Sequence, residues 1–324
     1  MGLLVDGAWQ EDFSLTKDGH FAHASTAFHD YVTADGSPGP TGRGGFPAEA
    51  NRYHLYVSLA CPWAHRTLIF RKLKKLEDVI SISITEPYMG QAGWEFGTGP
   101  GATLDTVNGK STLAAIYLVA DPHYGGRVSV PVLWDKKRRT IVNNESSEII
   151  RMLNSAFDAY TKERSDYYPV ELRAEIDRVN DIVYPNVNDG VYRSGFATTQ
   201  AAYEEAATAL FATLDRLEER LSRQRYLVGR RITEADWRLF TTLVRFDAVY
   251  YSHFKCNIRR IIDYPNLWNY LRELHQVPGV ADTVSLDHIK RHYYGSHRKI
   301  NPTGIAPIGP LIDFTLPHDR GRFA

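Results

Sequence analysis

A strand, a helix and a second strand follow one another early in the chain, and this order constrains the fold more than any other feature. Residues 53–59 contain aromatic side chains and the β-branched Val57 in an alternating pattern and predict a strand. Pro62 then opens a helical pattern with apolar residues on one side, and residues 79–84 predict the second strand. Strands that are joined through a helix pair in parallel, so this segment is expected to form a βαβ unit.

The segments that follow complete one α/β domain. Residues 112–120 predict a short helix, residues 130–134 and 140–142 two adjacent strands, and residues 145–153 an amphipathic helix. The resulting order, β-α-β and then α-β-β-α, is thioredoxin-like. A polar stretch at residues 85–109 interrupts it, and loops of that length are usually functional or disordered.

Strand patterns stop beyond about residue 165, and helical patterns take over at residues 170–188, 199–223, 233–251 and 264–275. Thr233 and Asp236 form a variant of the capping box at the start of the third helix. The chain ends in an irregular tail, rich in Pro and Gly, from about residue 301. These patterns predict an all-helical second half.

The sequence therefore predicts three parts. Residues 1–50, which are rich in Gly, Pro, Ser and Thr, are expected to form an extended N-terminal arm that wraps on a domain or is partly disordered. Residues 51–160 are expected to form the α/β thioredoxin-like domain. Residues 161–324 are expected to form the all-α domain with its irregular tail.

Composition excludes several classes of partner. The 324-residue chain carries 38 basic and 38 acidic side chains, so no global field favours nucleic acid or an anionic membrane. Its only two cysteines, Cys61 and Cys256, fit a reducing compartment rather than a disulfide scaffold. Neither a signal peptide nor an apolar run of roughly 18 residues is visible. We expect a cytoplasmic protein that binds neither nucleic acid nor membrane.

Cys61 lies where the first predicted strand ends and the first helix begins, in the motif Cys61-Pro-Trp-Ala64. The unpaired N–H groups and the dipole of a helix N-terminus favour negative charge and hence the reactive thiolate. Ala64 replaces the second cysteine of thioredoxin-type motifs, so an external thiol must resolve a mixed disulfide at Cys61. A buried structural cysteine is the alternative.

Two further positions suit a peptide-like ligand. A cis bond at Val130-Pro131 would turn the N–H and C=O of Val130 towards an extended peptide, whereas a trans proline at a strand entry is the commoner alternative. Glu145 and Ser146 open a helix, where amides and a hydroxyl suit a carboxylate and Glu145 suits an ammonium group. Those two demands match the γ-glutamyl end of glutathione, and a helix cap is the alternative.

The helical half contains tyrosines that could bind an aromatic molecule. Beside a thiolate, Tyr192, Tyr250 and Tyr293 could stack on an aromatic substrate and donate hydrogen bonds to its oxygens. The alternative is ordinary core packing, which covers most tyrosines in a chain that has 19 of them.

The remaining candidates are interpreted as structural. His288, His292 and His297 have a spacing that could hold a metal, but no carboxylate or cysteine joins them, so we expect no metal and a solvated basic helix end. Cys256 is expected to pack in a core. The basic run at residues 71–75 is expected to be a solvated helix face.

Several motifs, spread over nearly the whole chain, point to one family. The first half contains Cys61-Pro-Trp-Ala-His-Arg66, Gly93-Trp-Glu-Phe96, Arg127-Val-Ser-Val-Pro-Val-Leu-Trp134 and Asn144-Glu-Ser-Ser-Glu-Ile149. The second half contains Asn188-Asp-Gly-Val-Tyr-Arg-Ser-Gly195, Arg245-Phe-Asp-Ala-Val-Tyr250, His253-Phe-Lys-Cys-Asn257, His292-Tyr-Tyr-Gly-Ser-His297 and Ile300-Asn-Pro-Thr-Gly304. In these motifs the chain resembles the glutathionyl-hydroquinone reductases, the Xi class of glutathione transferases.

This resemblance implies a glutathione transferase fold, a homodimer and a set of site residues. By it, Cys61 would be the nucleophile, and glutathione would be held by Trp94, Arg127, Val130, Glu145 and Ser146. Tyr192, Tyr250 and Tyr293 would line the hydroquinone pocket.

The implied reaction is the reduction of a glutathionyl-hydroquinone through a mixed disulfide between Cys61 and glutathione, which a second glutathione resolves. Glutathione would be a co-substrate, and no metal would take part. An omega-like thioltransferase or dehydroascorbate reductase is the nearest alternative, and a non-catalytic binding protein on a transferase fold is the other.

Overall fold

The predicted βαβ unit is present. In the computed structural model, which describes residues 2–11, 16–22 and 25–323, strands β7 (Tyr53–Val57) and β8 (Ser81–Ile84) pair in parallel. Helix α1 (Pro62–Leu73) connects them. All five residues of β7 are buried, as expected for an interior strand whose two faces are both covered.

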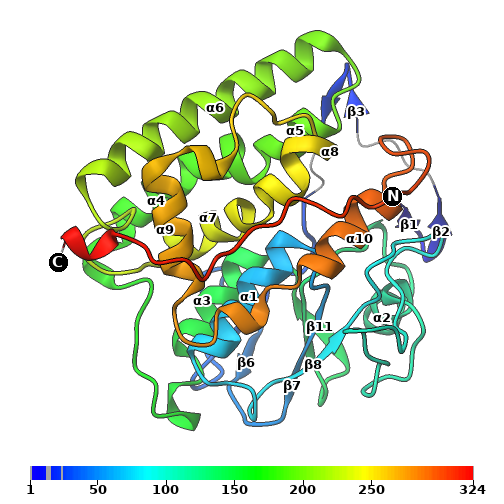
Figure 1. The fold of residues 1–324 in the computed structure, drawn as a ribbon. Helices are drawn as coiled ribbons and strands as arrows, with labels where there is room; N and C mark the ends of the chain where they lie inside the picture. Colours follow the sequence, from blue (N-terminus) through cyan, green and yellow to red (C-terminus); the bar gives the residue numbers. More distant parts are fainter. Residues whose placement is uncertain (1, 12–15, 23–24, 324) are drawn as a thin grey trace. The chain divides into compact units, whose positions relative to one another are not determined.

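Two further strands complete a four-stranded sheet with the order β11-β10-β7-β8. Strand β10 (Val132–Asp135) runs antiparallel both to β7 and to β11 (Thr140–Asn143), so the two adjacent strands expected at residues 130–142 are confirmed. Figure 1 shows β7, β8 and β11 together with the helices that follow them in the chain.

Helices α2 (Leu113–Ala120) and α3 (Ser146–Ser155) lie within two residues of their predicted ends. Thr112 begins α2, because its side chain accepts a hydrogen bond from the amide of Ala115 at 3.2 Å. Helix α3 contacts α1 and buries the apolar residues Ile149, Ile150, Met152 and Leu153. This burial follows from the amphipathic pattern of the sequence.

The polar stretch at residues 85–109 is ordered by two buried or half-buried carboxylates. Asp105 accepts hydrogen bonds from the Tyr56 hydroxyl at 2.9 Å and from the amides of Val107 and Asn108 at 3.0 and 3.1 Å. Glu86 accepts one from the amide of Gly99 at 2.8 Å. Of the two alternatives for this loop, disorder is therefore wrong.

The described part of the N-terminal arm forms short strands that the sequence did not predict: β1 (Leu3–Val5), β2 (Ala8–Gln10), β3 (Thr16–Lys17), β4 (His20–Phe21), β5 (Tyr31–Thr33) and β6 (Gly45–Pro47). Strand β1 pairs with β2 and with β9 (Gly126–Arg127), and β5 pairs with β6 in parallel. These strands have only two or three residues each, too few for an alternating pattern to be recognised, and the pairing of β1 with β9 joins segments that are far apart in sequence.

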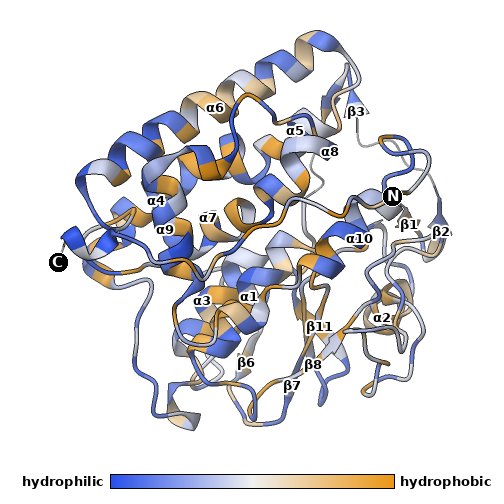
Figure 2. Ribbon diagram, in the orientation of Figure 1, coloured by the Kyte–Doolittle hydropathy of each residue, from blue (hydrophilic) through white to orange (hydrophobic). Residues whose placement is uncertain are grey.

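The second half is helical, as predicted. Its helices are α4 (Arg173–Val183), α5 (Gly190–Gly195), α6 (Gln200–Arg223), α7 (Glu234–Arg245), α8 (Tyr251–His253), α9 (Pro265–His275) and α10 (Leu286–Ser296). Segments of π-helix, Tyr184–Asn188 and Phe246–Tyr250, follow α4 and α7. Figure 2 shows polar and apolar residues alternating along α6. The capping box of Thr233 and Asp236 is present at the start of α7.

Contacts between Cα atoms divide the chain into two units. Unit 1 contains the described residues of 1–14, 24–165 and 283–292, and unit 2 contains those of 15–23, 166–282 and 293–324. The boundary thus crosses helix α10 between His292 and Tyr293. The domain limits expected at residues 50 and 160 stay a prediction.

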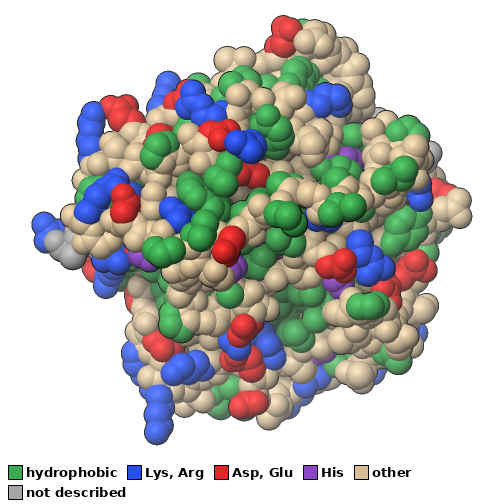
Figure 3. Space-filling view, in the orientation of Figure 1, with side chains coloured by type: hydrophobic (Ala, Val, Ile, Leu, Met, Phe, Trp, Pro, Cys, Tyr) green, Lys and Arg blue, Asp and Glu red, His purple; other side chains and the backbone are tan. Residues whose placement is uncertain are grey.

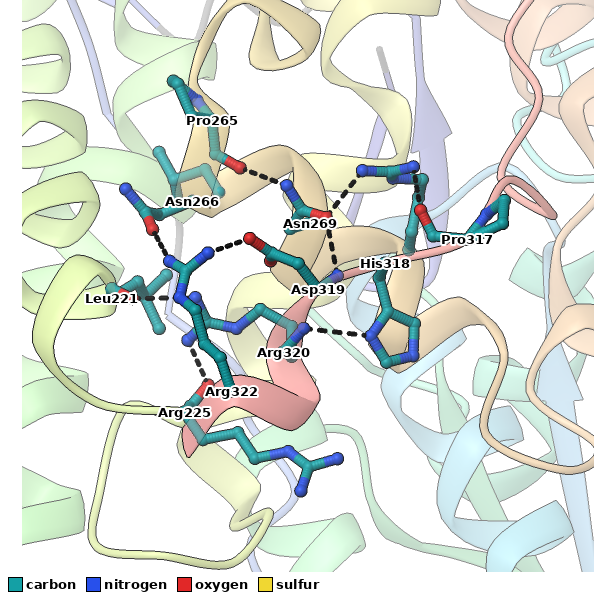
Figure 4. A network of polar contacts seen from close by, with 12 residues as sticks. Leu221, Arg225, Pro265, Asn266, Asn269, Pro317, His318, Asp319, Arg320 and Arg322 are labelled. Atoms are coloured by element: carbon teal, nitrogen blue, oxygen red, sulfur yellow. Dashed lines mark hydrogen bonds and ion pairs between the residues drawn. The ribbon is translucent and has the colours of Figure 1, made fainter. Parts of the chain in front are cut away.

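The irregular tail is anchored to unit 2 near its end (Figure 4). The fully buried Arg320 donates hydrogen bonds to the carbonyls of Leu221, Gln224 and Arg225 at 2.6 to 2.7 Å. The amide of Asp319 donates to the side chain of Asn269 at 3.0 Å. A cation on the last carbonyls of α6 also complements the helix dipole, so this contact stabilises a segment without regular structure.

The surface carries charge of both signs. Acidic and basic side chains are interspersed on the face that Figure 3 shows, in keeping with a formal net charge of zero. Among the described residues, no helix combines the length and the apolar character that a membrane span requires.

The basic run at residues 71–75 departs from the sequence-based expectation at two positions. Lys74 is only 1 % exposed, and its ammonium group donates to the carbonyl of Ser165 at 2.7 Å and pairs with Asp158 at 3.1 Å. Arg71 donates to the carbonyl of Ile80 at 2.7 Å. The expectation of a solvated face was wrong there, because loop carbonyls that follow α1 or lie far along the chain face these cations.

Candidate active site

Cys61 occupies the N-cap position of α1, directly before Pro62 at the first helical position. Its carbonyl accepts the first helical hydrogen bond, from the amide of His65 at 3.0 Å. Its sulfur is partly exposed and donates to the carbonyl of Val130 at 3.5 Å. The sequence therefore placed Cys61 correctly at a helix start, and the fold adds the Val130 backbone beside its sulfur.

The peptide bond between Val130 and Pro131 is cis, so the rarer of the two alternatives considered for this bond is the one observed. Val130 is 5 % exposed, and Pro131 directly precedes β10.

Glu145 and Ser146 lie at the start of α3. The carboxylate of Glu145 accepts hydrogen bonds from the amide and the hydroxyl of Ser147, both at 2.9 Å, so Glu145 is the N-cap of the helix. Ser146 is 2 % exposed, and its hydroxyl accepts a hydrogen bond from the Arg66 guanidinium at 3.2 Å. The interpretation of Glu145 as a helix cap is confirmed. A role of this helix start in binding a ligand stays a prediction.

Arg66 is a residue whose role the sequence did not reveal. It belongs to α1, is 1 % exposed, and connects that helix to the start of α3 through Ser146. A buried guanidinium requires polar partners, so an arginine within the apolar pattern that follows Cys61 was the available signal.

Trp94 lies in the polar stretch and is 5 % exposed. Its ring stacks on the His292 ring with 4.8 Å between centroids and 22° between planes. The His292 Nδ1 atom hydrogen-bonds to the carbonyl of Pro87 at 3.0 Å. Arg127, another of the residues expected to hold glutathione, lies in β9 opposite Leu3 of β1.

The expectation of a solvated histidine cluster on α10 was wrong at two positions. His288 and His292 are 2 % and 6 % exposed, and the Nε2 atom of His288 lies 2.6 Å from the carbonyl of Pro100. Both histidines face carbonyls of the polar stretch at residues 85–109. Their spacing of four residues places them on one helix face, which is the signal that the sequence offered.

The three predicted tyrosines come together in unit 2. The hydroxyl of Tyr293 hydrogen-bonds to the hydroxyl of Tyr192, and it lies 3.0 Å from the hydroxyl of Tyr250. Tyr250 and Tyr293 are at most 1 % exposed, and burial holds the pKa of Tyr293 well above its usual value. The Tyr293 phenol therefore stays protonated and can donate a hydrogen bond.

Aromatic rings surround this tyrosine cluster. Phe254 stacks on Tyr250 with 5.5 Å between centroids, and Phe21 and Phe196 stack on Tyr192 at 6.3 and 6.2 Å. These three phenylalanine rings carry no polar atom, so they offer the tyrosine hydroxyls no hydrogen-bond partner.

The other cysteine is confirmed as a packing residue. Cys256 is fully buried, and burial raises the pKa of its thiol to about 12, so it stays protonated and unreactive. Within the part of the chain that the structure describes, no three His, Cys, Asp or Glu side chains are grouped so that they could hold a metal ion.

Comparisons with known proteins agree with this architecture. The family model "Glutathione S-transferase, N-terminal domain" matches residues 60–156, and "Glutathione S-transferase, C-terminal domain" matches residues 200–273. The α/β half followed by the helical half is therefore the glutathione transferase fold.

Individual proteins match this chain over nearly its whole length. The glutathionyl-hydroquinone reductase YqjG of Escherichia coli is 57% identical over 99% of this chain and 98% of its own length, and its glutathione-bound structure superposes with a TM-score of 0.92, each chain being covered to 99%. The glutathionyl-hydroquinone reductase PcpF of Sphingobium chlorophenolicum is 54% identical over 96% of both chains.

A Xi class glutathione transferase from Natrialba magadii, 47% identical, superposes with a TM-score of 0.93 over 99% of this chain and 98% of its own. The chain belongs to the glutathionyl-hydroquinone reductase family, the Xi class of the glutathione transferases.

Proposed function

We propose that this protein reduces glutathionyl-hydroquinones to hydroquinones at the expense of glutathione. The observation that supports it most is the position of Cys61 at the N-terminus of α1, with its sulfur 3.5 Å from the Val130 carbonyl. The two relatives named as glutathionyl-hydroquinone reductases match this chain over nearly its whole length.

In the first step, the Cys61 thiolate attacks the glutathione sulfur of the substrate. A sulfur–sulfur bond forms and the bond from sulfur to the aromatic carbon breaks. That carbon keeps the electron pair and takes up a proton, which yields the hydroquinone and a Cys61–glutathione disulfide. Carbon is a poor leaving group, so the hydroxyls of Tyr192, Tyr250 and Tyr293 are proposed to hydrogen-bond the ring oxygens and to favour a protonated, keto-like form of the ring.

In the second step, the thiolate of another glutathione attacks the glutathione sulfur of the mixed disulfide. The Cys61 thiolate leaves, and oxidised glutathione is released. Ala64 lies where a resolving cysteine would stand, so the chain itself offers no second thiol at this place.

Glutathione is proposed to bind along unit 1. Trp94, Arg127, Val130, Glu145 and Ser146 are proposed to hold it, with the start of α3 facing its γ-glutamyl end and the Val130 backbone facing its cysteine. We also propose a cytoplasmic homodimer that uses no metal, with an arm at residues 1–50, a glutathione-binding domain at 51–160 and a substrate domain at 161–324.

Mass spectrometry of the intact protein tests this proposal. The protein is incubated with a glutathionyl-hydroquinone and no free glutathione. We expect one glutathione adduct on Cys61 and release of one hydroquinone. An adduct formed only from a glutathione disulfide would instead indicate an omega-like thioltransferase, and no adduct from either substrate would indicate a binding protein.

A further inference from the structure

A single buried hydroxyl connects the two backbone segments that are proposed to hold glutathione. Tyr117 of α2 is 0 % exposed. Its hydroxyl donates to the carbonyl of Ser129 at 2.8 Å and accepts from the amide of Ser129 at 3.3 Å. It also accepts from the side-chain amide of Asn144 at 3.0 Å.

Both partners of this hydroxyl directly precede proposed site residues. Ser129 is followed by Val130, whose carbonyl lies beside the Cys61 sulfur, and Asn144 is followed by Glu145 at the cap of α3. The Tyr117 hydroxyl therefore bonds at the same time to the residue before Val130 and to the residue before Glu145. Since Ser129 and Asn144 are separated by strands β10 and β11, their spacing is a tertiary property.

The N-terminal arm adds further hydrogen bonds to this network, at Asn144. The amide of Phe28 donates to the Asn144 side-chain carbonyl at 3.1 Å, and the amide of Asn144 donates to the carbonyl of Phe28 at 3.2 Å. The Phe28 ring packs edge-on against Tyr117 with 6.0 Å between centroids. The arm thus fixes the position of Asn144 and packs against Tyr117, to which Asn144 is hydrogen-bonded.

The hydroxyl has no capacity left for other partners. A phenol offers one donor and few acceptor positions, and all of these are used by Ser129 and Asn144. Burial raises the pKa of Tyr117, which keeps the phenol protonated and able to donate. Removal of this one oxygen would take a hydrogen-bond partner from the half-buried Ser129 backbone and from the buried Asn144 side-chain amide, and such groups move to find new partners.

We propose that Tyr117, held by Phe28 of the arm, is a positioning residue that sets the spacing between the Val130 backbone and the start of α3. In this proposal Tyr117 does not contact glutathione itself. It holds Val130 and the start of α3 at the spacing at which they can bind the cysteine and the γ-glutamyl group of one glutathione molecule at the same time. This inference rests on the glutathione site of the proposed function, and it gives the arm a role in that site.

The test compares Tyr117→Phe with Tyr53→Phe. Tyr53 is also fully buried in unit 1 and donates one hydrogen bond, to the carbonyl of Pro47 at 2.6 Å. Its hydroxyl is thus bonded neither to Ser129 nor to Asn144. Binding of S-methylglutathione, a glutathione thioether that cannot react, is measured by calorimetry for both variants and for the unchanged protein. The rate at which iodoacetamide alkylates Cys61 is measured in parallel, because this small reagent needs no glutathione site.

We expect Tyr117→Phe to weaken S-methylglutathione binding about tenfold or more, the effect of unpaired buried groups at a binding site. Tyr53→Phe should lower the thermal midpoint to a similar degree but change the Kd less than about twofold. Alkylation of Cys61 should stay within about twofold in both variants, which a general loss of structure would not allow.

Equal Kd values for Tyr117→Phe and the unchanged protein would overturn the inference, as would an equal loss in both variants. Should Tyr117→Phe not fold, Asn144→Ala removes the side-chain hydrogen bonds of Asn144 to Tyr117 and to the Phe28 amide, and it is judged by the same comparison. The proposed function fails separately, if the unchanged protein binds S-methylglutathione but forms no adduct from a glutathionyl-hydroquinone.

Discussion

The two candidate binding regions of this protein are held by different interactions. In unit 1, the groups proposed to bind glutathione include backbone atoms at Val130 and at the start of α3, and buried polar side chains fix the positions of these two segments. In unit 2, the candidate groups are the side-chain hydroxyls of Tyr192, Tyr250 and Tyr293, which hydrogen-bond to one another among aromatic rings. A substitution thus acts indirectly in the first region and directly in the second.

This difference follows from the ligands that each region would bind. A tripeptide offers backbone-like donors and acceptors, which a helix start and an extended segment can match without side chains. An aromatic ring with oxygens requires both a ring surface and hydroxyl donors, and tyrosine supplies both.

Replacement of Cys61 should have the largest effect. Cys61→Ala should abolish both the glutathione adduct and the reductase activity, because no other thiol lies at a helix start. Cys256→Ala is the matched control and should retain adduct formation, since the buried Cys256 thiol has a pKa of about 12. Intact-protein mass spectrometry and a turnover assay give the result, and full activity of Cys61→Ala would refute the mechanism.

Loss of a hydroxyl in unit 2 should separate the two substrate classes. Tyr293→Phe removes the central hydroxyl of the cluster and should lower kcat for glutathionyl-hydroquinones about a hundredfold, the usual size of a lost proton-donating group. Reduction of a small disulfide should change little. Tyr264→Phe is the control, because Tyr264 is a buried tyrosine of unit 2 bonded to Asp215 at 2.9 Å. An equal loss for both substrates would remove the tyrosines from a role in hydroquinone chemistry.

Arg66 should report on the glutathione region of unit 1. Arg66→Met removes the guanidinium that donates to Ser146 and should raise the KM for glutathione about tenfold with a smaller change in kcat. Arg66→Lys should restore part of the effect, because it keeps the charge without the planar donor geometry. Steady-state kinetics at varied glutathione concentration measure both constants, and a change confined to kcat would contradict the positioning role.

Low pH should lower the free energy of unfolding, because each unit contains a buried histidine. Burial lowers the pKa of His54 in unit 1 and of His253 in unit 2 from the usual 6.5 to about 4. Above pH 6.5 both are neutral whether folded or unfolded. Between 6.5 and about 4 only the unfolded chain takes up the proton, so the free energy of unfolding falls, for His54 by about 3 kcal/mol.

Urea unfolding at several pH values checks this expectation. His54→Gln should flatten the pH dependence between 6.5 and 4, and His253→Gln should flatten it by a comparable or smaller amount. An unchanged slope in His54→Gln would show that other groups cause the acid sensitivity.

Much of the fold was predictable because it depends on local patterns. The βαβ unit, the order of the later strands, the four long helical regions and the capping box at Thr233 all follow from periodicity and turn chemistry, which act within a few residues. The position of Cys61 at a helix start follows in the same way. The short strands of the arm were missed, because two or three residues are too few to show an alternating pattern and because the partner of β1 in β9 is far away in sequence.

The same contrast holds for the site. The sequence by itself determined which residue types stand at helix starts and at the entry of β10, and thus the kind of chemistry to expect. Only the tertiary structure decided that Tyr117 joins Ser129 to Asn144, that Arg66 meets Ser146 and that His292 stacks on Trp94. The physical reason is that a buried polar group must find a partner wherever the folded chain brings one, and no local pattern encodes a partner that lies tens or hundreds of residues away.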